Sequence, residues 1–463
     1  MRASSYLDRI ARIAAVIALS AAACQPLNNS PTRAAPSATA FSPPLTPALT
    51  APPRLATTTA PAPATATTTA TAAATPTPQL EIVRLSSQQG PDGANHLFGE
   101  VHNRGAVPIT DITLQLDWPG HAPITTTPAL AVIAAGQSAP FDLSLPADIP
   151  PPASLQLAIT SSRAADLETA SVSVEQLART DPGDGQFYLT GLLANAGARP
   201  IQIAGLAAVE VGPAGMIQSL GQSPVLVHYI APGQQAPFSI LLPSAQPDDA
   251  QWMVYPDARP VPPADAALTV TLTNAYHDEC GCLELAGLVR NAGAQALVAP
   301  LVAAVYDTQG QLQMVQSFST TLPVAPGAQL PFGIRFGASV STNLAPERAT
   351  VQVDLAGVAA PAAADAVPLP VQVVDQSQSN WELAFDAAIT NTSSQTLTGL
   401  DILAAVYNRA GHLVAAEPFS ISATDGGALP PGEALPFNAT LLLDNRAEPG
   451  GVKLVLTAQG RLH

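Results

Sequence analysis

The sequence predicts an all-β protein: four tandem antiparallel β-sandwich domains that follow a signal peptide and a disordered linker rich in Thr, Pro and Ala. Three observations lead to this prediction. A motif of Gly, three variable residues, Pro and Phe occurs four times in the 463 residues. Strand-like segments recur about every ten residues, separated by turn residues, as in sandwiches. The 47 prolines argue against long helices, because proline removes a backbone donor from a helix interior.

The repeated motif lies downstream of a second pattern, a small residue followed by three residues and an Asn. The motif reads GQSAPF (136–141), GQQAPF (233–238), GAQLPF (327–332) and GEALPF (432–437). The asparagines are Asn103, Asn195, Asn291 and Asn391, spaced 92, 96 and 100 residues apart. A period of about 95 residues suits a small domain and is too long for a solenoid unit, so we expect a duplicated β-domain.

Each part of the motif has a physical role. Gly supplies the positive φ that a turn requires, and Pro is tolerated at the first position of a strand. The apolar alternation that follows predicts a buried ring at the equivalent position of each repeat: Phe141, Phe238, Phe332 and Phe437. Each Asn is expected to hydrogen-bond to the backbone of the turn that follows it.

The repeats place the predicted sandwiches at residues 79–166, 167–260, 267–357 and 368–462. The joints between them read SSRAADLE, DARPVPPADA and AGVAAPAAADAVPL. Their Ala and Pro content predicts short, semi-rigid linkers.

The first 23 residues have the layout of a secretory signal. Three arginines precede an apolar run (13–23) that is too short to span a bilayer. The end of this run, LSAAAC, resembles the lipobox of bacterial lipoproteins, although Ala21 stands where leucine is commonest. The resemblance implies cleavage before Cys24, lipidation of Cys24 and a protein held on a membrane outside the cytoplasm. An ordinary signal peptide cut after Ala23 is the alternative.

Residues 24–78 are expected to form a disordered spacer. They are dominated by Ala, Thr, Pro and Ser and contain no Asp, Glu or Lys. Such a composition cannot bury a core, and Ser/Thr-rich tracts with Pro are typical of extended, O-glycosylated stalks.

The charge balance bears on the choice of partners. The formal net charge is -16, and the chain has a single lysine, Lys453. Nucleic acid is excluded as an expected partner, because phosphate binding requires clustered Lys and Arg. The expected partners are the membrane, through the lipid anchor, and a protein or cell-envelope polysaccharide.

Two segments carry a family resemblance. LVAAVYDTQGQL (301–312) and ILAAVYNRAGHL (402–413) each follow a strand that ends in Asn and precede a Pro-Gly and a Phe. Both are similar to the FxLYD domain, with cores at residues 305–307 and 406–408. The second repeat, LAAVEVGPAGMI, lacks the Tyr-Asp pair, and the first, ITLQLDWPG, diverges most. The resemblance implies Ig-like sandwiches of secreted or surface bacterial proteins, and no catalytic residues.

Motifs for chemistry are largely missing from the sequence. The seven histidines fall at non-equivalent positions without metal-type spacing, and neither a Gly-x-Ser-x-Gly elbow nor a phosphate loop occurs. We therefore expect no enzymatic activity, no cofactor and no metal. Trp118, Trp252 and Trp381 could bind sugars if exposed, but each lies on or beside a predicted strand and is expected in a core.

The segment HDECGCLEL (277–285) is the one unusual constellation. Apart from Cys24, Cys280 and Cys282 are the remaining thiols. Residues two apart on a strand lie near the upper distance limit for a disulfide, and Gly281 could bend the chain to permit one. A strained disulfide is the expected state outside the cytoplasm, with free thiols or a metal or redox role as the alternatives.

These observations predict a lipid-anchored extracytoplasmic protein with a structural or recognition role at the bacterial cell surface or periplasmic face. A carbohydrate- or solute-binding surface lipoprotein is the alternative. An extracellular enzyme is a further class, and the sequence offers no residues for it.

Overall fold

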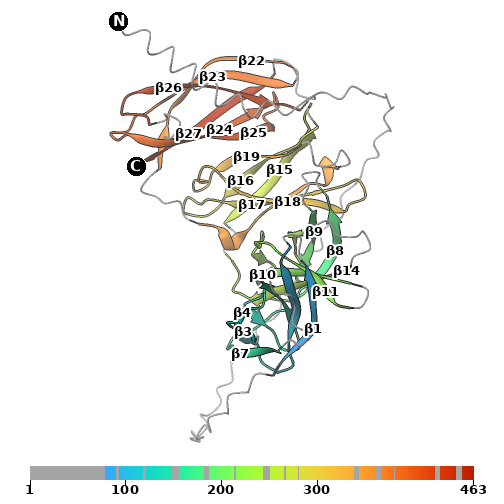
Figure 1. The fold of residues 1–463 in the computed structure, drawn as a ribbon. Coiled ribbons are helices and arrows are strands. Elements are labelled where there is room, and N and C mark those ends of the chain that lie inside the picture. Colours follow the sequence, from blue (N-terminus) through green and yellow to red (C-terminus); the bar gives the residue numbers. More distant parts are fainter. Residues whose placement is uncertain are drawn as a thin grey trace, which may run out of the picture. The chain divides into compact units, whose positions relative to one another are not determined.

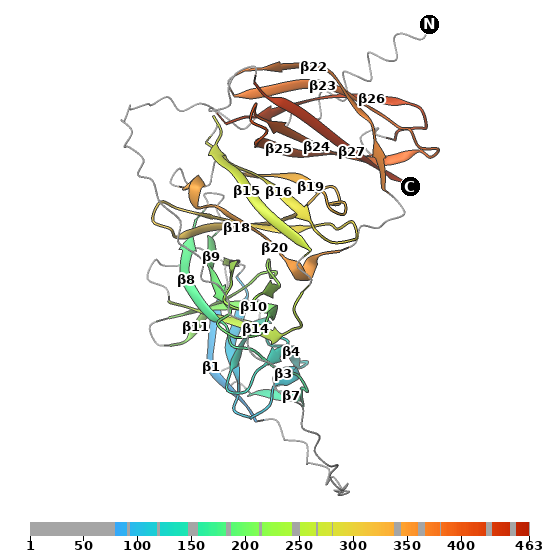
Figure 2. The ribbon, with the colours of Figure 1, turned by 180° about the vertical axis from the view of Figure 1, so that it is seen from behind.

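A computed structural model describes residues 79–462 except for short internal stretches, namely 90–92, 118–120, 147–155, 182–186, 213–214, 243–250, 265–266, 280, 338–343, 360–365, 380, 423–427 and 445–450. Figures 1 and 2 show this part of the chain as strands joined by turns. Within it there is no α-helix, and the helical turns are the 3-10 elements η2 (Pro346–Arg348) and η3 (Leu355–Gly357). The predicted all-β fold with antiparallel sheets is confirmed.

The strands follow one another in four repeats, each built of two sheets. In the first repeat, strands β1, β2 and β6 form what we call the first sheet, and β4, β3 and β7 form the second sheet, with β5 pairing β3. The second repeat has the same order, β8-β9-β13 and β11-β10-β14, with β12 pairing β10. The strands are β1 (Leu80–Gln89), β2 (Asn95–Asn103), β3 (Ile109–Asp117), β4 (Ile124–Thr126), β5 (Val132–Ile133), β6 (Ser138–Leu145), β7 (Gln156–Ala164), β8 (Ser173–Thr180), β9 (Phe187–Ala194), β10 (Ile201–Val211), β11 (Ile217–Gln222), β12 (Tyr229–Ile230), β13 (Gln235–Leu242) and β14 (Gln251–Pro260).

The third and fourth repeats keep this plan. Their first sheets are β15-β16-β19 and β22-β23-β26, and their second sheets are β18-β17-β20 and β25-β24-β27, the last extended by β21. Isolated bridges, Leu297 to Val324 and Leu397 to Leu429, stand where β5 and β12 pair in the earlier repeats. The strands are β15 (Leu268–His277), β16 (Leu283–Asn291), β17 (Pro300–Tyr306), β18 (Leu312–Ser319), β19 (Gln329–Phe336), β20 (Thr350–Val353), β21 (Ala366–Leu369), β22 (Val371–Gln378), β23 (Glu382–Thr390), β24 (Leu397–Tyr407), β25 (Leu413–Ser422), β26 (Ala434–Leu442) and β27 (Lys453–Leu462).

Apolar side chains from the facing sheets form the core of each repeat. In the fourth repeat, Leu383 and Ile389 of the first sheet join Ile402 and Val406 of the second in one buried cluster. Successive side chains of a strand point to opposite faces, so this alternation assigns one set of residues to the core and leaves the other set facing outward.

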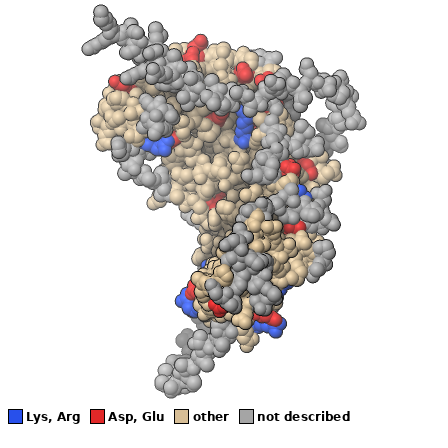
Figure 3. All heavy atoms as spheres, in the orientation of Figure 1, with Lys and Arg blue, Asp and Glu red and all other residues tan. Residues whose placement is uncertain are grey.

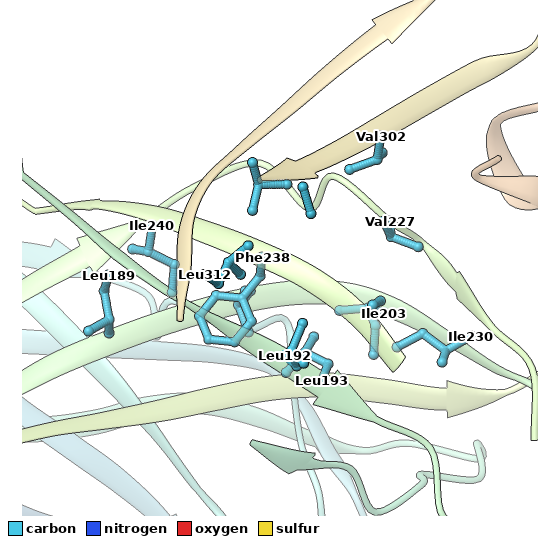
Figure 4. Packing of buried hydrophobic residues seen from close by; sticks show 14 of the residues in the cluster. Leu189, Leu192, Leu193, Ile203, Val227, Ile230, Phe238, Ile240, Val302 and Leu312 are labelled. Carbon is cyan, nitrogen blue, oxygen red and sulfur yellow. The ribbon is translucent and has the colours of Figure 1, made fainter. Parts of the chain in front are cut away.

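The buried clusters do not stop at the repeat boundaries. Val302 and Leu312 of the third repeat pack into the cluster that contains Phe238 of the second, as Figure 4 shows. Ala207 and Val209 of the second repeat likewise join a cluster of the first. All described strands belong to one compact unit, and the four domain boundaries stay predictions.

Strands occupy parts of the expected joints. Strand β7 runs to Ala164 within SSRAADLE, β14 runs to Pro260 within DARPVPPADA, and β21 begins at Ala366, ahead of the predicted boundary at residue 368. The extension of β14 is possible because Pro260, at its end, needs no backbone donor where it pairs with Ile201.

Candidate functional site

The four asparagines occupy the same position in each repeat and make the same contacts. Asn291, at the end of β16, is 0% exposed, and its Nδ2 donates to the carbonyl oxygens of Gln295 at 2.6 Å and Val324 at 2.8 Å. Its Oδ1 accepts from the backbone N–H of Gly293 at 2.8 Å. Asn103, Asn195 and Asn391 repeat this three-bond pattern. The side chain of the recurring Asn therefore serves to stabilise a turn.

The Gly-x-x-x-Pro-Phe motif forms the turn that meets each asparagine. Its glycines have φ between 69° and 75°: Gly136, Gly233, Gly327 and Gly432. Its four Phe rings are buried, with Phe437 the most exposed at 8%. The backbone N–H of Gly327 donates to the carbonyl of Asn291 at 2.9 Å, and the other three repeats have the equivalent bond. The motif thus closes the sandwich at one end.

The small residue upstream of each Asn faces the Phe ring across the first sheet. Gly287 pairs with Phe332, and a Cβ on Gly287 would lie 2.3 Å from a ring carbon. Gly99 and Gly191 show the same relation to their rings. In the fourth repeat the partner of Phe437 is Ala387. The shared residues of the repeats therefore serve the scaffold.

The HDECGCLEL segment runs from the last residue of β15 into β16. Cys280 lies outside the described residues, so its pairing with Cys282 stays a prediction. Cys282 is buried, its backbone N–H donates to Asp278 Oδ1 at 2.8 Å, and its Sγ lies 3.4 Å from a guanidinium nitrogen of Arg335.

Arg335, on β19, is the centre of an acidic cluster. Its guanidinium donates to Asp278 Oδ2 at 2.8 Å and lies 3.2 Å from Glu284 Oε1. The side chain of Asp278 is 0% exposed. Glu417, on β25 of the fourth repeat, interacts electrostatically with the same guanidinium. The cluster joins the two repeats, and the sequence did not predict it because Arg335 and Glu417 come from strands distant in the chain.

Burial shifts the acid–base behaviour of this cluster. Burial raises the pKa of Glu284 to about 8; Arg335 opposes this rise, while Asp278 and Glu417 add to it. Burial also raises the pKa of Glu417, and Arg335 again opposes it. Both carboxyl groups therefore hold a proton more tightly than an ordinary Glu does.

Two hollows lie along β15. One has a volume of about 500 Å³ and the other about 430 Å³, and both are lined in part by Thr273, Asn274 and Asp444. Tyr276, His277 and Glu347 line the first, whereas Arg409 and His412 line the second. Polar and apolar residues therefore line both hollows.

Most described histidines have individual partners. His96 Nδ1 lies 2.9 Å from Asp142, and His228 Nδ1 lies 2.8 Å from Asp354. Among the residues that the structure describes, no three His, Cys, Asp or Glu side chains are grouped so as to hold a metal ion.

The tryptophans differ from the expectation that all three lie in cores. Trp252 is half-buried against the second repeat's cluster, Trp381 is 36% exposed, and Trp118 lies outside the described residues. The expectation is wrong for Trp381 because it precedes β23, where the backbone carbonyl bonds to Leu443 and leaves the ring at the edge. Trp381 lines neither hollow.

Several predictions fall on parts of the chain that are not described. The signal peptide (1–23), Cys24 and the linker (24–78) lie outside the described residues. Within those that are described, no helix is long and apolar enough to cross a membrane. On the face drawn in Figure 3, acidic and basic side chains are scattered among uncharged ones.

Comparison with known proteins assigns no family. No family model matches the chain, and no curated protein matches it. Among solved structures, a red sea bream transglutaminase shares 17% identity over 42% of this chain and 29% of its own, with a TM-score of 0.16. A Salmonella alpha-2-macroglobulin mutant shares 9% identity over 81% of this chain and 29% of its own, with a TM-score of 0.13. A GH31 alpha-xylosidase from Xanthomonas citri shares 9% identity over 82% of this chain and 38% of its own, with a TM-score of 0.09. The chain thus spans less than two fifths of the length of each of these proteins, and the likenesses assign neither family nor activity.

Proposed function

We propose that this chain is a lipid-anchored extracytoplasmic protein whose four FxLYD-like, Ig-like repeats serve a structural or recognition role at the bacterial cell envelope. The observation that carries the proposal is that the residues common to all four repeats have structural roles. In every repeat the recurring Asn, Gly and Phe are engaged in the turn and the core. A common scaffold with divergent surfaces suits a spacer or binding protein.

The anchor and location rest on the sequence. The arginine-flanked apolar run, LSAAAC and the acid-free tract after Cys24 support acylation and a tether. Protein or cell-envelope polysaccharide remains the proposed partner class, and the acidic balance disfavours nucleic acid.

Site-specific photo-crosslinking in intact cells tests the recognition role. A photoreactive residue would replace one exposed residue in each repeat: His121, Leu241, Gln316 or Val374. Recognition predicts a crosslink to the same envelope component from at least one repeat, and the buried position Val406 serves as the control. If all four positions yield no product while the chain is on the membrane, recognition is excluded and a spacer role remains.

A carbohydrate-binding role is the second candidate, and the exposed ring of Trp381 favours it. Sugars stack on exposed aromatic faces, and such a contact buries large apolar area. Binding of envelope polysaccharide should then fall when Trp381→Ala is made and should survive Leu241→Ala, a matched loss of an exposed apolar side chain. Equal binding by both variants would rule out Trp381 as the contact.

A further inference from the structure

The contacts between successive repeats follow one pattern. In each case a hydroxyl on the first sheet of one repeat donates to the carbonyl of the first residue of a strand in the next repeat. Ser86 donates to Ile217, which begins β11. Thr190 donates to Leu312, which begins β18, at 2.8 Å, and Thr273 donates to Leu413, which begins β25, at 3.5 Å. Three equivalent carbonyls are thus bound by the preceding repeat.

The apolar surfaces at these junctions are also equivalent. The central strand of the second sheet presents outward small or aliphatic residues that are fully buried: Ala207 and Val209, Val302 and Ala304, Leu403 and Ala405. The preceding repeat covers them with its first sheet, where the residue five positions before the Asn is Phe98, Thr190 or Ala286, each at most 6% exposed. Figure 4 shows Val302 beside the second repeat's cluster.

The third junction is so close that it excludes a side chain. Gly333, on β19, lies against β25, and a Cβ on Gly333 would stand 1.6 Å from the carbonyl oxygen of Ala416. Asn274 adds a bond to the carbonyl of Val414 at 2.9 Å, and the buried Tyr276 bonds the carbonyl of Leu442 at 3.0 Å. These are features of a specific interface.

The two end faces carry different chemistry. In the fourth repeat the residue five positions before Asn391 is Asp386, which is exposed and pairs across the sheet with the exposed Asn438. In the first repeat the outward residues of β3 are Thr113, Gln115 and Asp117. Gln115 bonds Asp117 at 2.8 Å, and Thr113 accepts from Ser161 at 2.9 Å. At these compared positions the end faces carry charged or polar side chains, whereas the central strands of the second sheets at the junctions carry buried aliphatic residues.

We infer that the repeats join head to tail through one recurring interface, and that the first and fourth repeats are polar caps which prevent a second copy from extending the series. A head-to-tail interface has two different surfaces and would continue from copy to copy unless something stops it. Stacked repeat proteins likewise need terminal units with a polar outer face. The inference goes beyond the proposed function, because it holds whatever the repeats recognise.

The first experiment exchanges inner and outer residues in the full chain. Ala286→Asp places at the third junction the charge that the fourth repeat carries at Asp386, opposite the buried Ala405 and Leu413. Amides of β25 should then exchange hydrogen about tenfold faster or more, since an unpaired buried charge is strongly unfavourable. Asp386→Ala should leave exchange unchanged. Unaltered exchange in Ala286→Asp would overturn the inference.

A second pair of substitutions, with smaller changes, tests the junction in case Ala286→Asp fails to fold. Thr190→Val removes one junction hydroxyl with almost no change in volume, and Thr113→Val does the same at the cap. Exchange in β18 should accelerate for Thr190→Val, whereas Thr113→Val should leave every junction as it is. The same effect from both substitutions, or none from Thr190→Val, contradicts a junction role.

The second experiment removes the caps. A full chain with Gln115→Ala, Asp117→Tyr, Asp386→Ala and Asn438→Gly carries at both ends the residues of the third junction. These are the equivalents Ala405, Tyr407, Ala286 and Gly333. In one detergent, sedimentation should show this variant forming concentration-dependent oligomers, while the unmodified chain and variants changed at one end keep one chain per particle. Association of the unmodified chain through these faces, or a monomeric four-site variant, would refute the caps.

Discussion

Single residues in this protein are constrained by what lies directly across the sheet. The Phe ring of the motif covers a glycine on the neighbouring strand in three repeats, so the glycine cannot gain a Cβ. The fourth repeat accepts Ala387 and sets Phe437 edge-on to Phe385, with ring centroids 6.0 Å apart. A small residue is required because the ring fills the space in which its side chain would lie.

Gly287→Ala should therefore destabilise the third repeat. Its Cβ would lie 2.3 Å from Phe332 and 2.5 Å from the carbonyl oxygen of Thr271, and overpacking of this kind costs about 1–3 kcal/mol. Urea unfolding of the full chain followed by circular dichroism measures the loss. Gly205→Ala, where the nearest atom is 3.5 Å away, is the control and should stay within about 0.5 kcal/mol.

Glu284 should make stability depend on pH. Its pKa is raised to about 8 in the folded chain, against about 4.3 for an unperturbed Glu, so the folded state binds a proton more tightly. The stability that this pKa shift contributes is fully present below the pKa of Glu284 in the unfolded chain. It is lost as pH rises through about 8, the pKa in the folded chain. Asp278, Arg335 and Glu417 act on the same carboxyl.

The measurement compares melting curves at pH 5, 7 and 9. The unmodified chain should lose more stability than Glu284→Gln over this range, by several degrees in Tm, or about 2–4 °C for each 1 kcal/mol. Glu382→Gln changes an exposed carboxylate on β23 and should keep the original pH profile. Identical profiles for the unmodified chain and Glu284→Gln would show that Glu284 titrates as in the unfolded chain.

Among the elements, the turn after the second strand of each repeat is the most uniform. One asparagine ties the strand end to the turn and to the opposite strand, and the motif glycine bonds back to that asparagine's carbonyl. The turn thus links both sheets of a sandwich at one point.

Asn291→Ala should cost about 2–4 kcal/mol, because two carbonyls and one N–H lose their partners at a buried site. Asn291→Asp should be no better, since it keeps the acceptor for Gly293 but turns a charge toward the carbonyls of Gln295 and Val324. Urea midpoints give the comparison. The exposed Asn438→Ala is the matched control, and a similar loss there would mean that burial of the amide is irrelevant.

At the scale of the whole molecule, the proposed anchor is separate from the folded strands. Among the described residues, no helix is long and apolar enough to cross a membrane. In the proposed arrangement the chain is attached through Cys24, which the linker separates from the proposed sandwiches.

Cys24→Ala should abolish membrane attachment and leave the sandwiches folded. Fractionation of cells that express either form, with labelled palmitate, measures location and acylation together. The unmodified chain should take up label and sediment with membranes, and the variant should do neither. Membrane association of both forms without label would contradict the lipoprotein reading.

The fold class was predictable because it depends on local patterns. Period-two apolar spacing, the Gly turn and the Asn that ends a strand each act within a few residues. The requirement for Gly287 was not foreseen, since it depends on a cross-strand neighbour 45 positions away in the pairing with Phe332. The sequence did not predict the Arg335 cluster for the same reason, because Glu417 comes from another repeat. Contacts between distant strands are set by tertiary packing, which a local pattern does not report.

The differing residues at the junctions have a consequence for biosynthesis. The equivalent position carries an aromatic ring in Phe98, a hydroxyl in Thr190 and only a methyl group in Ala286. A repeat that packs on the wrong neighbour therefore meets a surface of the wrong size. Translation proceeds from the N-terminus at about 5–20 residues per second, and neighbouring repeats of similar sequence are prone to misassembly. Each newly made repeat leaves its first sheet uncovered until the following one emerges. We expect these unlike sizes to favour the native order of neighbours as the chain grows.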